Sequence, residues 1–239
     1  MNDRPERPFW TWNDFLIFAA LALPSMMLGM LIARGLLSII PGYTPTKAMK
    51  LLPGQFLGYL FWYIALRWLL LMKYERPFWS SLGWRWPREG IARYLSAGVM
   101  LTVFVILLGA LLRTPQVKSP MDELMEGSGA LILVGISAVA LAPVCEELAF
   151  RGFLQPLLAH SIGAWPGVVL TALPFALLHG SQYAWSWRHL LLLTIAGSTF
   201  GWVRMRSGST LAATAAHAAY NFSYFMTFVL VGKDTTQTL

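Results

Sequence analysis

The stretch Glu146-Glu147-Leu148-Ala149-Phe150-Arg151 places three ionisable side chains inside a long apolar segment of the chain. Residues 130–142 before it are mostly apolar, and a second apolar run begins after Gly152. A charge at membrane depth costs about 2.5–3.5 kcal/mol on insertion scales, so such residues are rare and usually functional. The stretch therefore predicts a membrane helix with a functional site in its middle.

The composition supports a membrane protein. Of the 239 residues, 56% are hydrophobic and only 12% are charged, against about 25% charged in an average soluble domain. The net charge of +7 is typical of cytoplasmic loops beside a lipid bilayer, and no basic stretch alternates with aromatic residues as a nucleic-acid groove would. We expect a single membrane domain over residues 1–239 and no nucleic-acid partner.

Seven segments are candidates for membrane spans, since a spanning helix needs roughly 20 apolar residues. They are residues 15–40, 51–72, 94–112, 130–158, 164–179, 189–203 and 209–231. We predict an all-α, polytopic transmembrane bundle of seven to eight helices, with polar residues converging on an intramembrane cavity. The protein would be a multi-pass protein of the cell membrane.

The loops differ in charge, which predicts an orientation. Loop 73–93 holds five Lys and Arg residues, and loop 204–208 holds two. Loop 113–128 is acidic instead, with Asp122, Glu123 and Glu126. Because cytoplasmic loops carry an excess of Lys and Arg, we expect the two basic loops and the N-terminus to be cytoplasmic. Residues 75–93 would form an interfacial helix or a loop lying on the membrane.

Three further polar residues lie within apolar segments: His179, His217 and Asn221. The last two are four residues apart and therefore share one helix face. Counting residues from the helix ends at 1.5 Å each places them and Glu146 roughly 12–24 Å from one surface. We therefore expect three helices to bring polar groups to one layer of the membrane.

These residues supply the parts needed for amide hydrolysis. Glu147 and Arg151 are spaced as an i, i+4 ion pair, with the acid in the favourable N-terminal position. Glu146 is rotated by about 100° from Glu147, so it is free to face a cavity and act as a base toward water. A nearby His can hold the same water, and an Asn amide with a second His can donate to an oxyanion.

The motifs resemble those of the CAAX protease and bacteriocin-processing family, also called the Abi family, of intramembrane proteases. That family has EExxxR, then FxxxH, then HxxxN. This chain has Glu146-Glu147-x-x-x-Arg151, Phe175-x-x-x-His179 and His217-x-x-x-Asn221, in that order. The resemblance covers about residues 141–224, and all three motifs on successive membrane segments make it specific.

The resemblance implies an intramembrane endopeptidase whose catalytic core is formed by the helices of residues 130–231. Glu146 and His179 would activate water, and His217 with Asn221 would stabilise the oxyanion. The second glutamate and the arginine of the first motif would support the site. The substrate would be a membrane-associated peptide or protein.

Two questions stay open at this point. Glu146, His179 and His217 could form a Glu-His-His zinc set, although the HExxH pattern of metalloproteases is absent. A metal-free glutamate mechanism is the alternative. The protein could also be a membrane scaffold or bacteriocin-immunity factor that cleaves nothing, or a transporter with a proton relay. We find no inverted repeat of the kind that transporters show.

Overall fold

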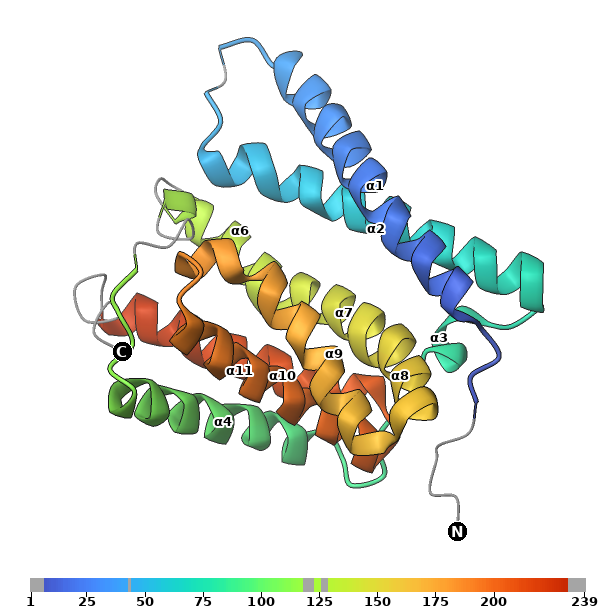
Figure 1. The fold of residues 1–239 in the computed structure, drawn as a ribbon. Helices are drawn as coiled ribbons and strands as arrows, with labels where there is room; N and C mark the ends of the chain where they lie inside the picture. The colour runs from blue at the N-terminus through green and yellow to red at the C-terminus, as the bar shows by residue number, and fades with distance from the viewer. Residues whose placement is uncertain (1–6, 43, 118–122, 126–128, 232–239) are drawn as a thin grey trace.

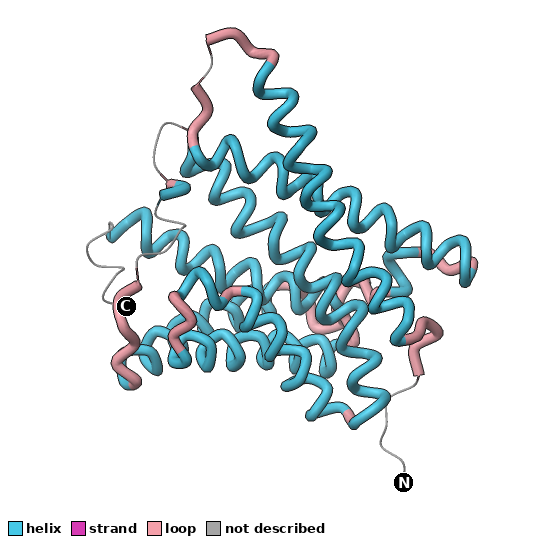
Figure 2. The backbone as a smooth tube through the Cα atoms, turned by 45° about the horizontal axis from the view of Figure 1, so that its top comes forward, coloured by secondary structure: helices cyan, strands magenta, loops and turns pink. Residues whose placement is uncertain are grey.

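The computed structural model describes residues 7–42, 44–117, 123–125 and 129–231. All regular structure within these residues is helical (Figure 1), which confirms the all-α prediction. Figure 2 shows helices joined by short loops, with no strand in the described part of the chain.

The long helices match the seven predicted segments. They are α1 (Trp12–Ser38), α2 (Lys47–Tyr74), α4 (Ala92–Leu111), α9 (Ala164–Leu178), α10 (Trp187–Ser207), α11 (Thr210–Val231) and the run Ala130–Ile162. That run consists of α6 (Ala130–Ile136), the π-helical segment η1 (Ser137–Leu141), α7 (Ala142–Glu147), the π-helical segment η2 (Leu148–Leu154) and α8 (Gln155–Ile162). The region expected to form an interfacial helix or loop contains only the short α3 (Phe78–Ser81).

Not every predicted span is apolar enough to cross a membrane on its own. Within the described residues, four helices are long and apolar enough to cross a membrane: α1, α2, α4 and the run Ala130–Ile162. The 15-residue α9 is apolar but shorter. Helices α10 and α11 have 21 and 22 residues, but they are not among the four, because the His, Arg, Ser and Thr residues of α10 and the His, Asn, Ser and Thr residues of α11 lower their hydropathy.

The helices pack in two groups around the run Ala130–Ile162. In Figure 1, α1 and α2 form a hairpin on one side and α4 lies on the other, with α10 and α11 between them. One apolar core joins α4, α10 and α11, and another joins the hairpin to the run through Phe18, Leu66 and Phe153. The run is therefore held from both sides.

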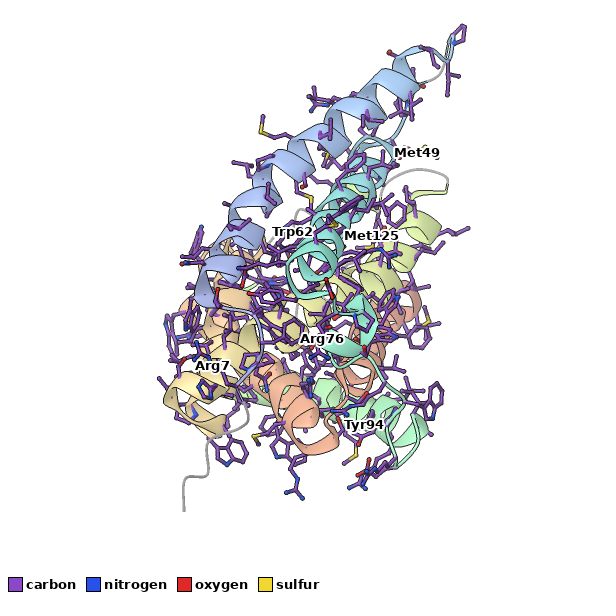
Figure 3. All side chains as sticks on the ribbon, turned by 90° about the vertical axis from the view of Figure 1, so that its right-hand side faces the viewer. Arg7, Met49, Trp62, Arg76, Tyr94 and Met125 are labelled. Carbon is purple, nitrogen blue, oxygen red and sulfur yellow. The ribbon has the colours of Figure 1, made fainter. Side chains whose placement is uncertain are left out.

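Helices α1 and α2 approach closely at glycines. A Cβ added at Gly29 would collide with the backbone of Gly54 and Gly58 on the opposite helix. Trp62 lies where the two helices meet (Figure 3), stacks on Phe18 with ring centroids 4.2 Å apart, and donates from Nε1 to its carbonyl at 2.6 Å. This seam allows no added side chain at Gly29.

The two basic loops lie at the same end of the bundle. Arg85 Nε donates to the Gly208 carbonyl at 2.7 Å, which joins loop 75–91 to the turn between α10 and α11. A surface ion pair, Lys47 with Glu123 at 2.6 Å, lies at the N-terminal end of α2. The clustering agrees with the expected positive side, while the orientation itself stays a prediction.

Replacing Gly29 by Ala should separate α1 from α2 and lower the melting temperature in detergent. Overpacking of this kind costs about 1–3 kcal/mol. The matched control is Gly35→Ala on the same helix, where an added Cβ meets nothing within 4 Å. That control should be neutral or stabilising, because Ala is favoured over Gly in a helix by about 1 kcal/mol. Equal melting temperatures for the two variants would contradict the close seam.

Candidate active site

Glu146 lies at the centre of the candidate site, in the last turn of α7. One carboxylate oxygen is 4.0 Å from Nε2 of His179, and the other is 3.8 Å from Nε2 of His217. These side chains come from three separate helical segments, so the predicted convergence of Glu146, His179 and His217 is observed. The Glu146 and His179 side chains are 18% and 22% exposed, which leaves the site open to a small molecule such as water.

His179 has a defined tautomer. It follows the last turn of α9, and its Nδ1 is 2.8 Å from the Phe175 carbonyl. A carbonyl oxygen can only accept, so Nδ1 must carry a proton. In the neutral ring, Nε2 then presents a lone pair toward Glu146. The Phe and His of the second motif thus cooperate through the backbone, since Phe175 supplies the acceptor that sets the proton on His179.

His217 is held by the second glutamate. Its Nδ1 is 2.9 Å from Oε1 of Glu147, and its side chain is only 4% exposed. The ring stacks on Phe200 with centroids 4.5 Å apart and an interplanar angle of 16°. The edge of Phe175 contacts it from another side at 5.7 Å. These contacts fix the ring so that Nε2 points toward Glu146.

Glu147 and Arg151 form the predicted i, i+4 ion pair, which is fully buried. Arg151 Nη1 donates to Glu147 Oε1 at 3.0 Å, and both side chains have no exposed surface. Nη2 donates to the Gly197 carbonyl of α10 at 2.6 Å. The guanidinium also lies over the Phe175 ring at 4.7 Å from its centroid. Each added contact offsets part of the desolvation cost of the pair.

Asn221 is placed differently from the expectation. Its Nδ2 donates to the carbonyl of Ala138 in η1 at 2.8 Å, rather than lying free beside Glu146. Pro143 has no N–H, so a carbonyl in the preceding turn loses its helical donor. Asn221 supplies a donor to this turn from α11. The side-chain amide of Asn221 has two N–H groups, so the second one is not used by the bond to Ala138. The oxyanion role of Asn221 therefore stays a prediction.

Glu146 and Glu147 lie between two π-helical segments, η1 and η2. Such segments widen a helix locally and occur often at functional sites. Both glutamates themselves lie in the regular α7, where adjacent residues are rotated by about 100°, so their side chains leave the helix toward different partners.

Residues 128–223 match the family model described as type II CAAX prenyl endopeptidase Rce1-like. This segment is an Rce1-like domain. It includes all three motifs and agrees with the family resemblance inferred from them. The comparisons with curated proteins and with solved structures gave no match.

The Rce1-like domain supports a hydrolase of the protease class in a membrane setting. Its limits, 128–223, fall close to the ends of the helices that carry the candidate site. Helices α1, α2 and α4 lie outside it. They contribute the surrounding packing, and α2 also contributes polar groups that sequence reasoning missed.

Two tyrosines of α2 face the Rce1-like domain near Glu146. The Tyr63 hydroxyl donates to the Cys145 carbonyl, and Tyr59 accepts from Gln55 Nε2 at 3.1 Å. Both tyrosines are close enough to Glu146 for its charge to act on their hydroxyls. Their i, i+4 spacing in an otherwise apolar helix was the signal that could have found them.

The geometry of Glu146, His179 and His217 differs from that of a zinc site. Zinc ligands at 2.0–2.1 Å in a tetrahedron lie about 3.4 Å from each other. The Glu146 oxygens are instead 4.0 and 3.8 Å from the two histidines, and each oxygen faces a different ring. Within the described residues no group of three or more His, Cys, Asp or Glu side chains could hold a metal ion. The residues do not fit a metal centre in this arrangement.

Replacing Arg151 by Ala should strongly destabilise the protein, because it leaves Glu147 charged and buried without its partner. Breaking a buried pair in this way costs about 3–5 kcal/mol. The measurement is thermal unfolding in detergent, with Lys47→Ala as the control. Lys47 forms an ion pair whose side chains are 62% and 44% exposed, and such pairs contribute at most about 1 kcal/mol. An Arg151→Ala protein that melts like wild type would show that the pair is not a structural requirement.

Proposed function

We propose that this protein is an intramembrane endopeptidase in which Glu146 and His179 activate water for attack on a peptide bond. The observation that carries the proposal is the position of the two Nε2 atoms, 4.0 and 3.8 Å from the Glu146 carboxylate. The Rce1-like domain supports the class of reaction. The residue roles are our own assignment.

The distances favour a water between the groups. A direct N–H···O hydrogen bond spans about 2.7–3.2 Å, so neither histidine bonds Glu146 directly. A separation of 4.0 Å lets one water contact both the carboxylate and Nε2 of His179. In neutral His179 that nitrogen accepts, so such a water would direct one O–H to the histidine and the other to Glu146.

In the proposed reaction the water oxygen attacks the carbonyl carbon of the substrate and Glu146 takes one of its protons. The new C–O bond produces a tetrahedral intermediate with a negative oxygen. As the C–N bond breaks, the proton on Glu146 passes to the departing amine. The products are a carboxylic acid and an amine, and the carboxylate of Glu146 is restored.

His217 is the proposed donor to the oxyanion. Its Nδ1 proton is directed to Glu147, so Nε2 donates only when the ring is protonated. The remaining N–H of Asn221 is the second proposed donor.

The proposed substrate is a membrane-associated peptide or protein, reached from within the bilayer. A prenyl group on that substrate is not part of the proposal. We place the protein in the cell membrane with its N-terminus in the cytoplasm, following the charges of the loops.

The Glu146→Gln variant should lose peptide cleavage, because an amide cannot take a proton from water. Its melting temperature should stay close to wild type, since Gln has the same size. A cleavage screen with a membrane-peptide library compares the two proteins. Cys145→Ala is the matched control, because it changes the neighbouring residue and tests the thiol as a rival nucleophile. Cleavage that persists in Glu146→Gln but disappears in Cys145→Ala would reject the assignment.

A chelator should leave cleavage by the wild-type protein unchanged, because the proposed reaction needs only protein groups and water. The measurement is the initial rate before and after incubation with EDTA, together with elemental analysis of the purified protein. Loss of activity that returns with added zinc would assign the Glu146, His179 and His217 set to a metal after all.

A further inference from the structure

Arg85 and Arg204, at the basic end of the bundle, each pack against a glycine that leaves room for the guanidinium group. Arg204, near the end of α10, lies against Gly83 of the loop after α3, where a Cβ would collide with the guanidinium. Arg85 of that loop lies in turn against Gly208, where a Cβ would come within 3.1 Å of Nη2. Both glycines have positive φ, at 71° and 64°, which side chains rarely adopt. The arginine of the turn region thus packs on the loop, and the arginine of the loop packs on the turn.

Hydrogen bonds hold the two segments together. Thr210 N donates to the Gly83 carbonyl at 2.9 Å, and its hydroxyl donates to the Leu82 carbonyl at 2.5 Å. The Ser209 hydroxyl donates to the Arg85 carbonyl, and Arg85 Nε donates to Gly208. The positions of the two arginines are therefore set before any ligand arrives.

The charges of this pair are not balanced by protein. Within the described residues no carboxylate lies within ion-pair distance of Arg85 or Arg204, and Arg204 Nε is buried without a hydrogen-bond partner. The single acid of loop 82–91, Glu89, accepts from the Tyr94 hydroxyl at 2.8 Å. Arg151 Nε also lacks a hydrogen-bond partner, but the charge of that buried guanidinium is balanced by Glu147 beside it.

We propose that Arg85 and Arg204 bind the phosphate group of an anionic phospholipid. Guanidinium groups match phosphate oxygens in geometry and are weakly hydrated, so paired arginines favour this ligand. The surroundings favour a lipid as its source. Trp86 follows Arg85, and Trp202 lies two residues before Arg204; they are 69% and 42% exposed, as in an aromatic belt at a membrane surface.

The test is the melting temperature in detergent micelles that contain equal fractions of phosphatidylglycerol or phosphatidylcholine. Phosphatidylglycerol should raise the melting temperature of wild type by about 3–6 °C at about ten times its Kd, and phosphatidylcholine by less. Arg85→Gln and Arg204→Gln should lose this shift. Arg206→Gln, an exposed arginine of the same turn, removes the same charge and should retain it.

Each outcome decides the proposal. Arg85 is exposed, so Arg85→Gln tests the site even if Arg204→Gln fails to fold. An equal shift from both lipids, or an equal loss in Arg206→Gln, would overturn the site in favour of general charge attraction. A third arm uses inorganic phosphate against chloride at matched ionic strength. A phosphate shift that depends on Arg85 and equals the lipid shift would assign the site to free phosphate and overturn the lipid as its source.

Discussion

The arrangement of the site depends on one buried ion pair. Glu147 and Arg151 have no exposed surface, and removal of either partner would leave an uncompensated charge in a low dielectric. The pair also reaches beyond its own helix, because Glu147 Oε1 holds His217 of α11 and Arg151 holds the Gly197 carbonyl of α10. Three helices are thereby aligned through two side chains. Glu146, one residue earlier, is directed into the space that this alignment leaves.

The same pair explains why two adjacent glutamates can have different environments. Glu147 is fully buried and its charge is paired with Arg151. Glu146 is instead partly exposed and has no direct hydrogen bond to either histidine. Aromatic rings separate the two regions. Phe175 contacts Arg151, His179 and His217, so one side chain shields the ion pair and shapes the wall of the site. The second motif therefore contributes its phenylalanine as well as its histidine.

Sequence reasoning succeeded where the physical cause is local. Apolar runs located the seven long helices, and i, i+4 spacing identified the Glu147–Arg151 pair. Helix ends were less accurate, as for 189–203 against Trp187–Ser207, because polar residues continue α10 up to Ser207. The bond between His217 and Glu147 was missed, since it depends on how α11 is rotated against another helix. The partner of Asn221 was missed for a related reason, because η1 could not be inferred from hydropathy.

The bond from Asn221 to Ala138 has a consequence for biogenesis. The ribosome delivers α11 last among the described helices, some 80 residues after η1 has left the exit tunnel. Until then a carbonyl of the interrupted helix lacks the amide that will satisfy it, and His217 is absent from beside Glu146. A nascent chain truncated before α11 therefore contains the acid but not its completed surroundings, so hydrolytic competence would arise only once the whole polypeptide has been inserted and assembled.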